Sequence, residues 1–150
     1  MGVYQIRTYS PLPPWLVYSS SMRYLGVDYG SKRIGVALSD PSGSMAFPEC
    51  VIENKGLRKA AEELLRLARE KGVEAVVLGE SRDYQGRPNA IHAQVQNLKV
   101  FLEAEFAVFY ESETLTSAEA ARGETNQLDA SAAAIILNSF LTRKRLMPDR

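Results

Sequence analysis

The sequence predicts an α/β domain with a mixed five-stranded sheet and flanking helices. Three segments with the composition of β-strands follow one another between residues 23 and 53, separated by short turns. Beyond them, segments with apolar residues at helical spacing alternate with short continuous apolar runs. Three antiparallel strands followed by alternating helices and strands form a mixed sheet that helices cover.

The first three strands are expected at about 23–29, 33–39 and 45–53. Between the second and third strands lies Asp40-Pro-Ser-Gly43, a sequence typical of a tight turn. Asp40 itself is most simply explained as a turn residue, because its short side chain can accept hydrogen bonds from nearby backbone amides.

Helical and strand patterns alternate in the rest of the chain. A helix is expected between Gly56 and Gly72, because six apolar residues recur at helical spacing: Leu57, Ala60, Ala61, Leu64, Leu67 and Ala68. The run Ala75–Leu78 is typical of a strand buried on both faces. The remaining expected elements are a polar loop at 80–89, a helix at 90–104, a strand at 107–110, a helix near 117 capped by Thr116 and Glu119, and a last helix at about 129–143.

One domain of 150 residues fits the composition, which is 45% hydrophobic and 24% charged. The prolines at positions 11, 13 and 14 interrupt the only apolar stretch before the first strand. We therefore expect residues 1–21 to be a disordered or loosely packed extension, with Met22 as a candidate natural start. Residues 22–145 are expected to form the domain and 146–150 a frayed tail.

Charge and cysteine content exclude several classes of function. Basic and acidic residues number 18 each, so no overall positive field attracts nucleic acid, and any such binding must rest on local patches. The single cysteine, Cys50, excludes an internal disulfide and a cysteine-cluster zinc site, and fits a reducing, cytoplasmic compartment. No apolar run approaches the roughly 20 residues of a membrane span, so no membrane partner is expected.

Three acids stand at the ends of expected elements, where a metal site can form. Asp28 ends the first strand, Glu113 follows the fifth, and Asp129 opens the last helix. Carboxylate clusters of this kind suit Mg²⁺ and the hydrolysis of phosphodiesters. Each acid also has a structural explanation: Asp129 as a helix N-cap, Glu113 as a solvated loop residue, and Asp28, less readily, as a strand residue.

Four motifs in order resemble those of the YqgF/RuvX family of Holliday-junction-resolvase-like, pre-16S rRNA nucleases. They are Gly26-Val-Asp-Tyr-Gly-Ser-Lys-Arg-Ile-Gly-Val-Ala-Leu-Ser-Asp40, Val76-Val-Leu-Gly79, Glu113-Thr-Leu-Thr-Ser-Ala-Glu-Ala120, and Leu128-Asp-Ala-Ser-Ala-Ala with Ile135-Ile-Leu137. The resemblance covers about 22–143 and implies an RNase H-like fold. It also implies that Asp28, Glu113 and Asp129 are metal-binding catalytic carboxylates for Mg²⁺ or Mn²⁺.

The chain departs from the family pattern at two places. Where the family usually has Asp-Glu-Arg, this chain has Ser112-Glu-Thr114, so an arginine that could contact a phosphate is missing. Candidates for substrate contacts are four other cations: Lys32, Arg33, Arg82 and Arg87.

At the second place, Glu80 replaces the usual leucine after the fourth strand; it is either a fourth carboxylate of the site or a charge at its rim. Glu111 is an alternative to Glu113 as the site's glutamate, because residues two positions apart in a strand point to the same face of the sheet.

These observations predict a metal-dependent endonuclease that trims the 5′ end of precursor 16S rRNA or acts on Holliday junctions, as a monomer or homodimer. The main alternative is a nucleic-acid-binding or ribosome-assembly factor that has lost catalysis. A third possibility is a kinase-like phosphate turn at Asp28-Tyr-Gly-Ser31. The length of the chain argues against it, because such kinases pair two domains of this kind.

Overall fold

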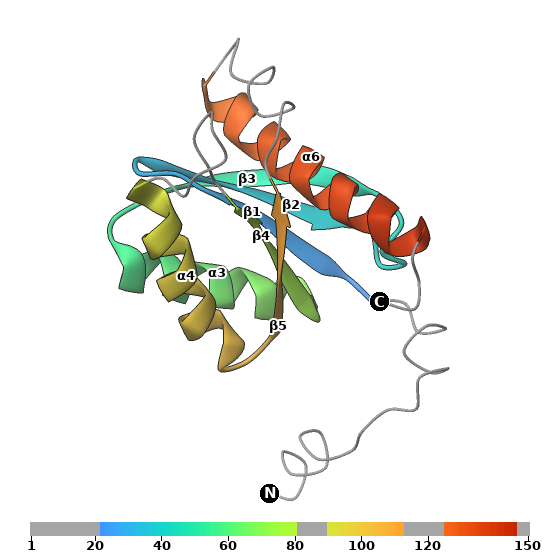
Figure 1. The fold of residues 1–150 in the computed structure, drawn as a ribbon, viewed down its shortest axis with the longest axis horizontal. Coiled ribbons are helices and arrows are strands. Elements are labelled where there is room, and N and C mark those ends of the chain that lie inside the picture. The colour runs from blue at the N-terminus through green and yellow to red at the C-terminus, as the bar shows by residue number, and fades with distance from the viewer. Residues whose placement is uncertain (1–21, 81–89, 113–124, 147–150) are drawn as a thin grey trace, which may run out of the picture.

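The structure, a computed structural model, describes residues 22–80, 90–112 and 125–146 (Figure 1). The predicted extension at 1–21, the loop at 81–89 and the helix near 117 lie outside these ranges. The described elements are β1 (Tyr24–Tyr29), β2 (Arg33–Ser39), β3 (Ala46–Glu53), α3 (Leu57–Glu70), β4 (Ala75–Glu80), α4 (Ala90–Glu103), β5 (Ala107–Ser112) and α6 (Thr125–Leu146).

The five strands form one mixed sheet in the order β3-β2-β1-β4-β5. β1 and β2 pair antiparallel, as do β2 and β3, whereas β4 is parallel to both of its neighbours. Parallel neighbours require a crossover, and α3 and α4 supply the two crossovers. The predicted fold class is thereby confirmed.

Helices cover both faces of the sheet. α3 and α4 pack on one face, and α6 lies across the other (Figure 1). Alternate residues of each strand enter the two cores: Val76 and Leu78 face α3 and α4, while Ala75 and Val77 face α6. Burial on both faces explains the continuous apolar run of β4.

The last helix begins earlier than its apolar pattern indicates. α6 starts at Thr125, so Asp129 is its fifth residue and not its N-cap. The N-cap explanation of Asp129 is therefore wrong. The helix also continues to Leu146, three residues beyond the expected end. Polar residues at both ends carry no apolar periodicity, which is why the sequence pattern covers only the middle of this helix.

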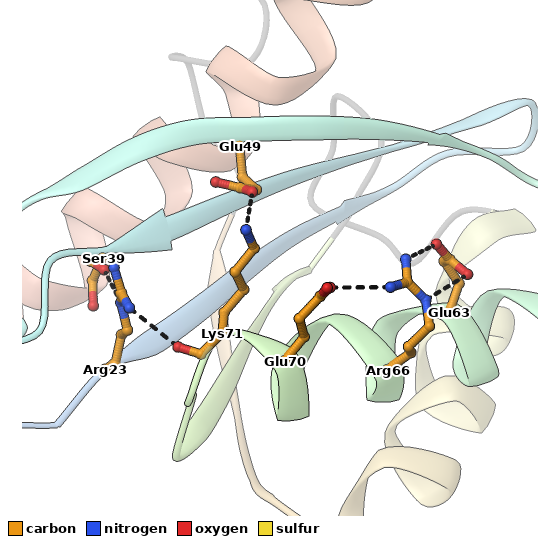
Figure 2. Close-up of polar contacts among 7 residues, drawn as sticks. All are labelled: Arg23, Ser39, Glu49, Glu63, Arg66, Glu70 and Lys71. Carbon is orange, nitrogen blue, oxygen red and sulfur yellow. Dashed lines mark hydrogen bonds and ion pairs between the residues drawn. The ribbon is translucent and has the colours of Figure 1, made fainter.

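Polar contacts fasten the end of the sheet where β1 begins (Figure 2). The Arg23 side chain donates to the carbonyl oxygens of Ser39 at 2.9 Å and Lys71 at 3.1 Å. The Lys71 ammonium in turn lies 3.2 Å from a carboxylate oxygen of Glu49. These contacts join β1, β2, β3 and the end of α3, opposite the end at which β1 carries Asp28.

The turn after β2 is organised around the carboxylate of Asp40, as predicted. Its Oδ1 accepts hydrogen bonds from the backbone amides of Ser44 at 2.8 Å and Met45 at 2.9 Å. The Ser42 hydroxyl donates to Oδ2. The hydrogen bond from the Met45 amide, followed by that from Ser42, lowers the pKa of Asp40 from 3.8 to about 2.

This pKa predicts how the turn responds to acid. Because the folded pKa lies below the ordinary value, the carboxylate's contribution is complete above pH 3.8 and is lost as the pH falls towards 2. An NMR titration of the Asp40 side-chain carbon should give a midpoint near 2, with the Ser44 and Met45 amide shifts following it. A midpoint near 4 would contradict the hydrogen-bonded turn.

Candidate active site

Asp28 lies on the face of the sheet that α6 covers. Two residues before it, Gly26 packs so closely under the helix that an added Cβ would be 2.8 Å from the Cβ of Leu137. Two residues earlier still, the Tyr24 ring lies against Phe140, with 5.6 Å between ring centroids. Side chains alternate along a strand, so Asp28 points to the same face as these two residues.

The first turns of α6 lie at the end of β1 that carries Asp28. α6 runs opposite to β1, since Phe140 lies over Tyr24 and Ala133 over Gly26. The step from Gly26 to Asp28 is about 6.6 Å, which corresponds to four or five residues of helix. Asp28 is therefore level with the turn around Ala130, next to the backbone of Asp129. The Asp129 side chain is outside the described part of the structure.

Glycines flank Asp28 on both neighbouring strands. Its partner in β2 is Gly35. The parallel register that pairs Val27 with Leu78 brings Gly79 of β4 beside it on the other side. Neither neighbour in this row contributes a side chain beside the Asp28 carboxylate, and glycines in strands often mark places where a ligand or another backbone approaches closely.

Glu111 stands in the same row, beyond Gly79. Two strand spacings, about 10 Å, separate its backbone from that of Asp28. Its carboxylate forms an ion pair with Arg143 of α6, and the Glu111 side chain is only 12% exposed. Arg143 also packs over the Phe140 ring. Glu111 therefore fastens α6 to the edge of the sheet, and Glu113, its rival for the site, lies outside the described residues.

Glu80 lies on the opposite face. It follows Leu78 by two residues, so it points towards α3 and α4. An independent observation agrees: burial against this core raises the pKa of Tyr110, and the Glu80 charge raises it further. This arrangement argues against Glu80 as a fourth carboxylate beside Asp28.

Two cations stand next to the site, one in the turn after β1 and one at the start of β2. Lys32 and Arg33 line a groove of about 840 Å³ whose other walls include Asn54 and Ala130. The turn is closed by a 3.0 Å hydrogen bond from the Gly30 amide to the Arg33 carbonyl oxygen. A Cβ on Gly30 would lie 2.6 Å from that oxygen, so the backbone of Arg33 approaches this position too closely for any larger residue.

The structure thus brings together Asp28, Lys32, Arg33 and the backbone of Asp129. Glu113, Arg82 and Arg87 lie outside the described residues. Among the residues that are described, no group of three or more acidic, histidine or cysteine side chains could hold a metal ion. Within the same ranges, no helix is long and apolar enough to cross a membrane.

Comparison with known proteins identifies the family. The family model named RuvX, described as a Holliday junction resolvase, matches residues 22–143. The chain belongs to the RuvX family. Membership of this family confirms the predicted class of enzyme, a nuclease.

Curated relatives of this RuvX-family chain extend over most of its length. A protein of Nitratidesulfovibrio vulgaris is 39% identical over 132 residues, which are 80% of this chain and 93% of the relative. A Pelotomaculum thermopropionicum protein is 39% identical over 133 residues, covering 80% and 86% of the two chains. Both carry the name "Putative pre-16S rRNA nuclease".

Solved structures of resolvases share the fold of the RuvX-family chain. RuvC of T. thermophilus, in complex with a Holliday junction substrate, has a TM-score of 0.56 at 16% identity, covering 83% of this chain and 96% of RuvC. The Fowlpox virus resolvase, with Holliday junction DNA, has a TM-score of 0.55 at 12% identity, covering 81% and 98%. These similarities confirm the RNase H-like fold.

Proposed function

We propose that this protein is a divalent-metal-dependent endonuclease that hydrolyses phosphodiester bonds of structured RNA, with precursor 16S rRNA as its substrate in the cytoplasm. The single observation that carries the proposal is the position of Asp28. It is an acid at a strand end, flanked by glycines on both sides, on the face where α6 brings the backbone of Asp129.

The residues at this position fit a divalent cation. Asp28, Glu113 and Asp129 would hold Mg²⁺ or Mn²⁺, because such hard cations prefer carboxylate oxygens, and the glycine neighbours leave room for the ion beside Asp28. When bound, the ion supplies Lewis-acid stabilisation of the phosphoryl oxygens and of the attacking water.

The chain's own cations would orient the substrate. Lys32 lies in the turn after β1 and Arg33 begins β2, four and five residues after Asp28, and both line the adjoining groove. They would hold the phosphates next to the scissile bond, together with Arg82 and Arg87. These cations would take the place of the arginine that Thr114 replaces in the family motif.

The names of the relatives favour RNA, whereas the description of the family favours a DNA junction. The two substrates make different demands on assembly. Resolving a junction requires two paired cuts and therefore a dimer, whereas a monomer can trim rRNA. We therefore expect a monomer in solution if the rRNA assignment is correct.

Cleavage of defined substrates tests the proposal. Purified protein should cut end-labelled precursor 16S rRNA with Mg²⁺ or Mn²⁺ and become inactive in EDTA. A four-way DNA junction of matched length should be cut more slowly. Preferential cutting of the junction by a dimer would replace the RNA assignment with a DNA one, and cleavage that continues in EDTA would exclude the metal.

Substitution of the two glutamates near the end of β5 should separate their roles. Glu113→Gln is expected to lower the cleavage rate by about 10²-fold or more, because it removes a charged ligand. Glu111→Gln should lower stability by no more than about 1 kcal/mol, since its partner Arg143 is half exposed and stays solvated. Single-turnover rates and thermal melts of both variants measure the difference. The opposite ranking would make Glu111 the ligand.

A catalytically inactive RNA-binding factor is the second candidate. Its support is that Glu111, an acid in the same row as Asp28, is engaged by Arg143 and that Thr114 stands where the family motif has arginine. Tight binding of precursor rRNA without turnover in either metal would favour this candidate over the nuclease.

A further inference from the structure

Three cations in the described part of the chain form neither ion pairs nor side-chain hydrogen bonds: Lys32, Arg58 and Lys59. Other cations of α3 are engaged. Figure 2 shows Arg66 between Glu63 and Glu70, with nitrogen–oxygen distances of 2.5 and 3.0 Å. Arg69 pairs with Glu105 at 2.7 Å. Within residues 22–80, 90–112 and 125–146, the cations without such partners are therefore one in the β1–β2 turn and two neighbours in the first turn of α3.

Both places are at the end of the sheet at which β1 carries Asp28. The turn between β1 and β2 and the first turn of α3 both lie there, at the left of Figure 1. Two grooves meet at Glu53, the last residue of β3. The groove of about 840 Å³ is lined by Lys32 and Arg33, and a second of about 650 Å³ by Lys55 and Lys59.

Acidic residues offset only part of this charge. The two grooves are lined by five cations and three acids, and Arg58 stands next to Lys59 on the exposed side of α3. Of the acids, Glu63 is engaged by Arg66, which lowers the pKa of its carboxyl group. Glu53 lies 3.9 Å from Lys55. The surface is positive although the whole chain is neutral.

Asn54 fixes the two halves of this surface relative to each other. Its backbone amide donates to the Lys32 carbonyl oxygen at 2.9 Å, and its Nδ2 donates to that of Gly30 at 2.7 Å. Its Oδ1 accepts from the Gly56 amide at 3.0 Å, directly before α3. The cations of the β1–β2 turn and those of α3 are therefore held at a fixed distance from each other. A ligand with evenly spaced negative charges, such as a phosphate backbone, suits this arrangement.

We propose that Lys32, Lys55, Arg58 and Lys59, hereafter the cationic track, bind the phosphate backbone of a duplex flank of the nucleic-acid substrate. The inference rests on the proposed function, because the track begins beside Asp28. β3 lies two strand spacings, about 10 Å, from β1, and α3 follows β3. Since a duplex rises by about 3.4 Å per base pair in B-DNA and by less in A-form RNA, Arg58 and Lys59 contact phosphates about three or more base pairs from the cut.

Salt-dependent binding tests the track. Full-length protein is titrated into a fluorescent RNA hairpin in EDTA, which prevents cleavage, at several salt concentrations. The double variant Arg58→Gln with Lys59→Gln should bind about tenfold more weakly, and the slope of log affinity against log salt should fall by about 2. The control is Arg69→Gln with Lys99→Gln, which removes two cations that already pair with glutamates. It should bind as the wild type does.

The single cysteine gives a second readout that does not depend on activity. Cys50 lies in the wall of the first groove, and burial raises the pKa of its thiol. RNA on the track should slow maleimide labelling of Cys50 several-fold at pH 8.5. At the same RNA concentration, the Arg58/Lys59 double variant should lose this protection. Equal protection in the wild type and the variant would overturn the proposal.

Cleavage of substrates with duplex flanks of different length tests the cationic track independently of the proposed nuclease activity. With a flank of eight base pairs, the double variant should show a raised KM and an unchanged kcat; with a flank of two, it should match the wild type. If the wild type cleaves and the variant shows no change in KM or salt slope, the track is wrong and the nuclease assignment stands. If the wild type neither binds nor cleaves, both fail.

Discussion

Asp28→Asn is expected to lower the cleavage rate by at least about 10²–10³-fold, the loss typical when one group that stabilises developing charge is removed. Asparagine has nearly the same shape but no charge, so it holds a divalent cation far less tightly. Since Asp28 stands between two glycines on the α6 face, the change should leave the packing intact. Single-turnover cleavage of labelled precursor rRNA in Mn²⁺ measures the rate.

Asp40→Asn provides the matched control. It is the same chemical change at the other end of the sheet, in a turn whose carboxylate accepts two backbone hydrogen bonds. This variant should keep the wild-type cleavage rate. Asp28→Asn should also bind RNA in EDTA as tightly as the wild type. A variant at position 28 that cleaves at the normal rate would remove Asp28 from the site, whatever happens to its affinity.

Local patterns in the sequence predict much of this fold because local physics determines them. The helix at 57–71 follows from apolar spacing, and five of its six expected apolar residues are buried, with Leu57 half-buried. The strand at Ala75–Leu78 follows from a continuous apolar run, and all four of its residues are buried. The Asp40 turn follows from the chemistry of one short side chain and its neighbours. The sequence signal for each of these features lies within about fifteen consecutive residues, although the contacts that bury them come from distant parts of the chain.

Features of the site that depend on register are harder to predict. Gly35 and Gly79 flank Asp28 only because three strands pair in a particular alignment, and no single segment specifies that alignment. The partner of Glu111 is Arg143, 32 residues away. Side chains alternate between the two faces of the sheet, which explains why Glu80 faces away from Asp28. This alternation assigns a residue to a face only when the elements that cover each face are known. Sequence patterns therefore suggest candidate carboxylates more readily than their arrangement.

Gly26→Ala should destabilise the protein by about 2–3 kcal/mol, a typical cost of overpacking a core. For a domain of this size that corresponds to a decrease in Tm of roughly 5–12 °C. Alanine and valine suit strands as well as or better than glycine does, so intrinsic preference predicts the opposite sign. Space decides the outcome: the new Cβ would lie 2.8 Å from the Cβ of Leu137 and 3.1 Å from the Ala133 carbonyl oxygen.

No shortening of the Leu137 side chain to alanine relieves these contacts, because one involves a Cβ and the other the helix backbone. α6 must move away from β1, and it carries Asp129 with it. Gly26→Ala should therefore lower the cleavage rate even when the assay is run well below the melting temperature of the variant, where the protein is still folded. Gly72→Ala is the control: its φ of +70° strains alanine, but a Cβ there has no neighbour within 4 Å. It should cost about 1 kcal/mol and leave cleavage unchanged. If Gly26→Ala melts early but cleaves normally when folded, the seating of α6 on β1 does not set the geometry of the site.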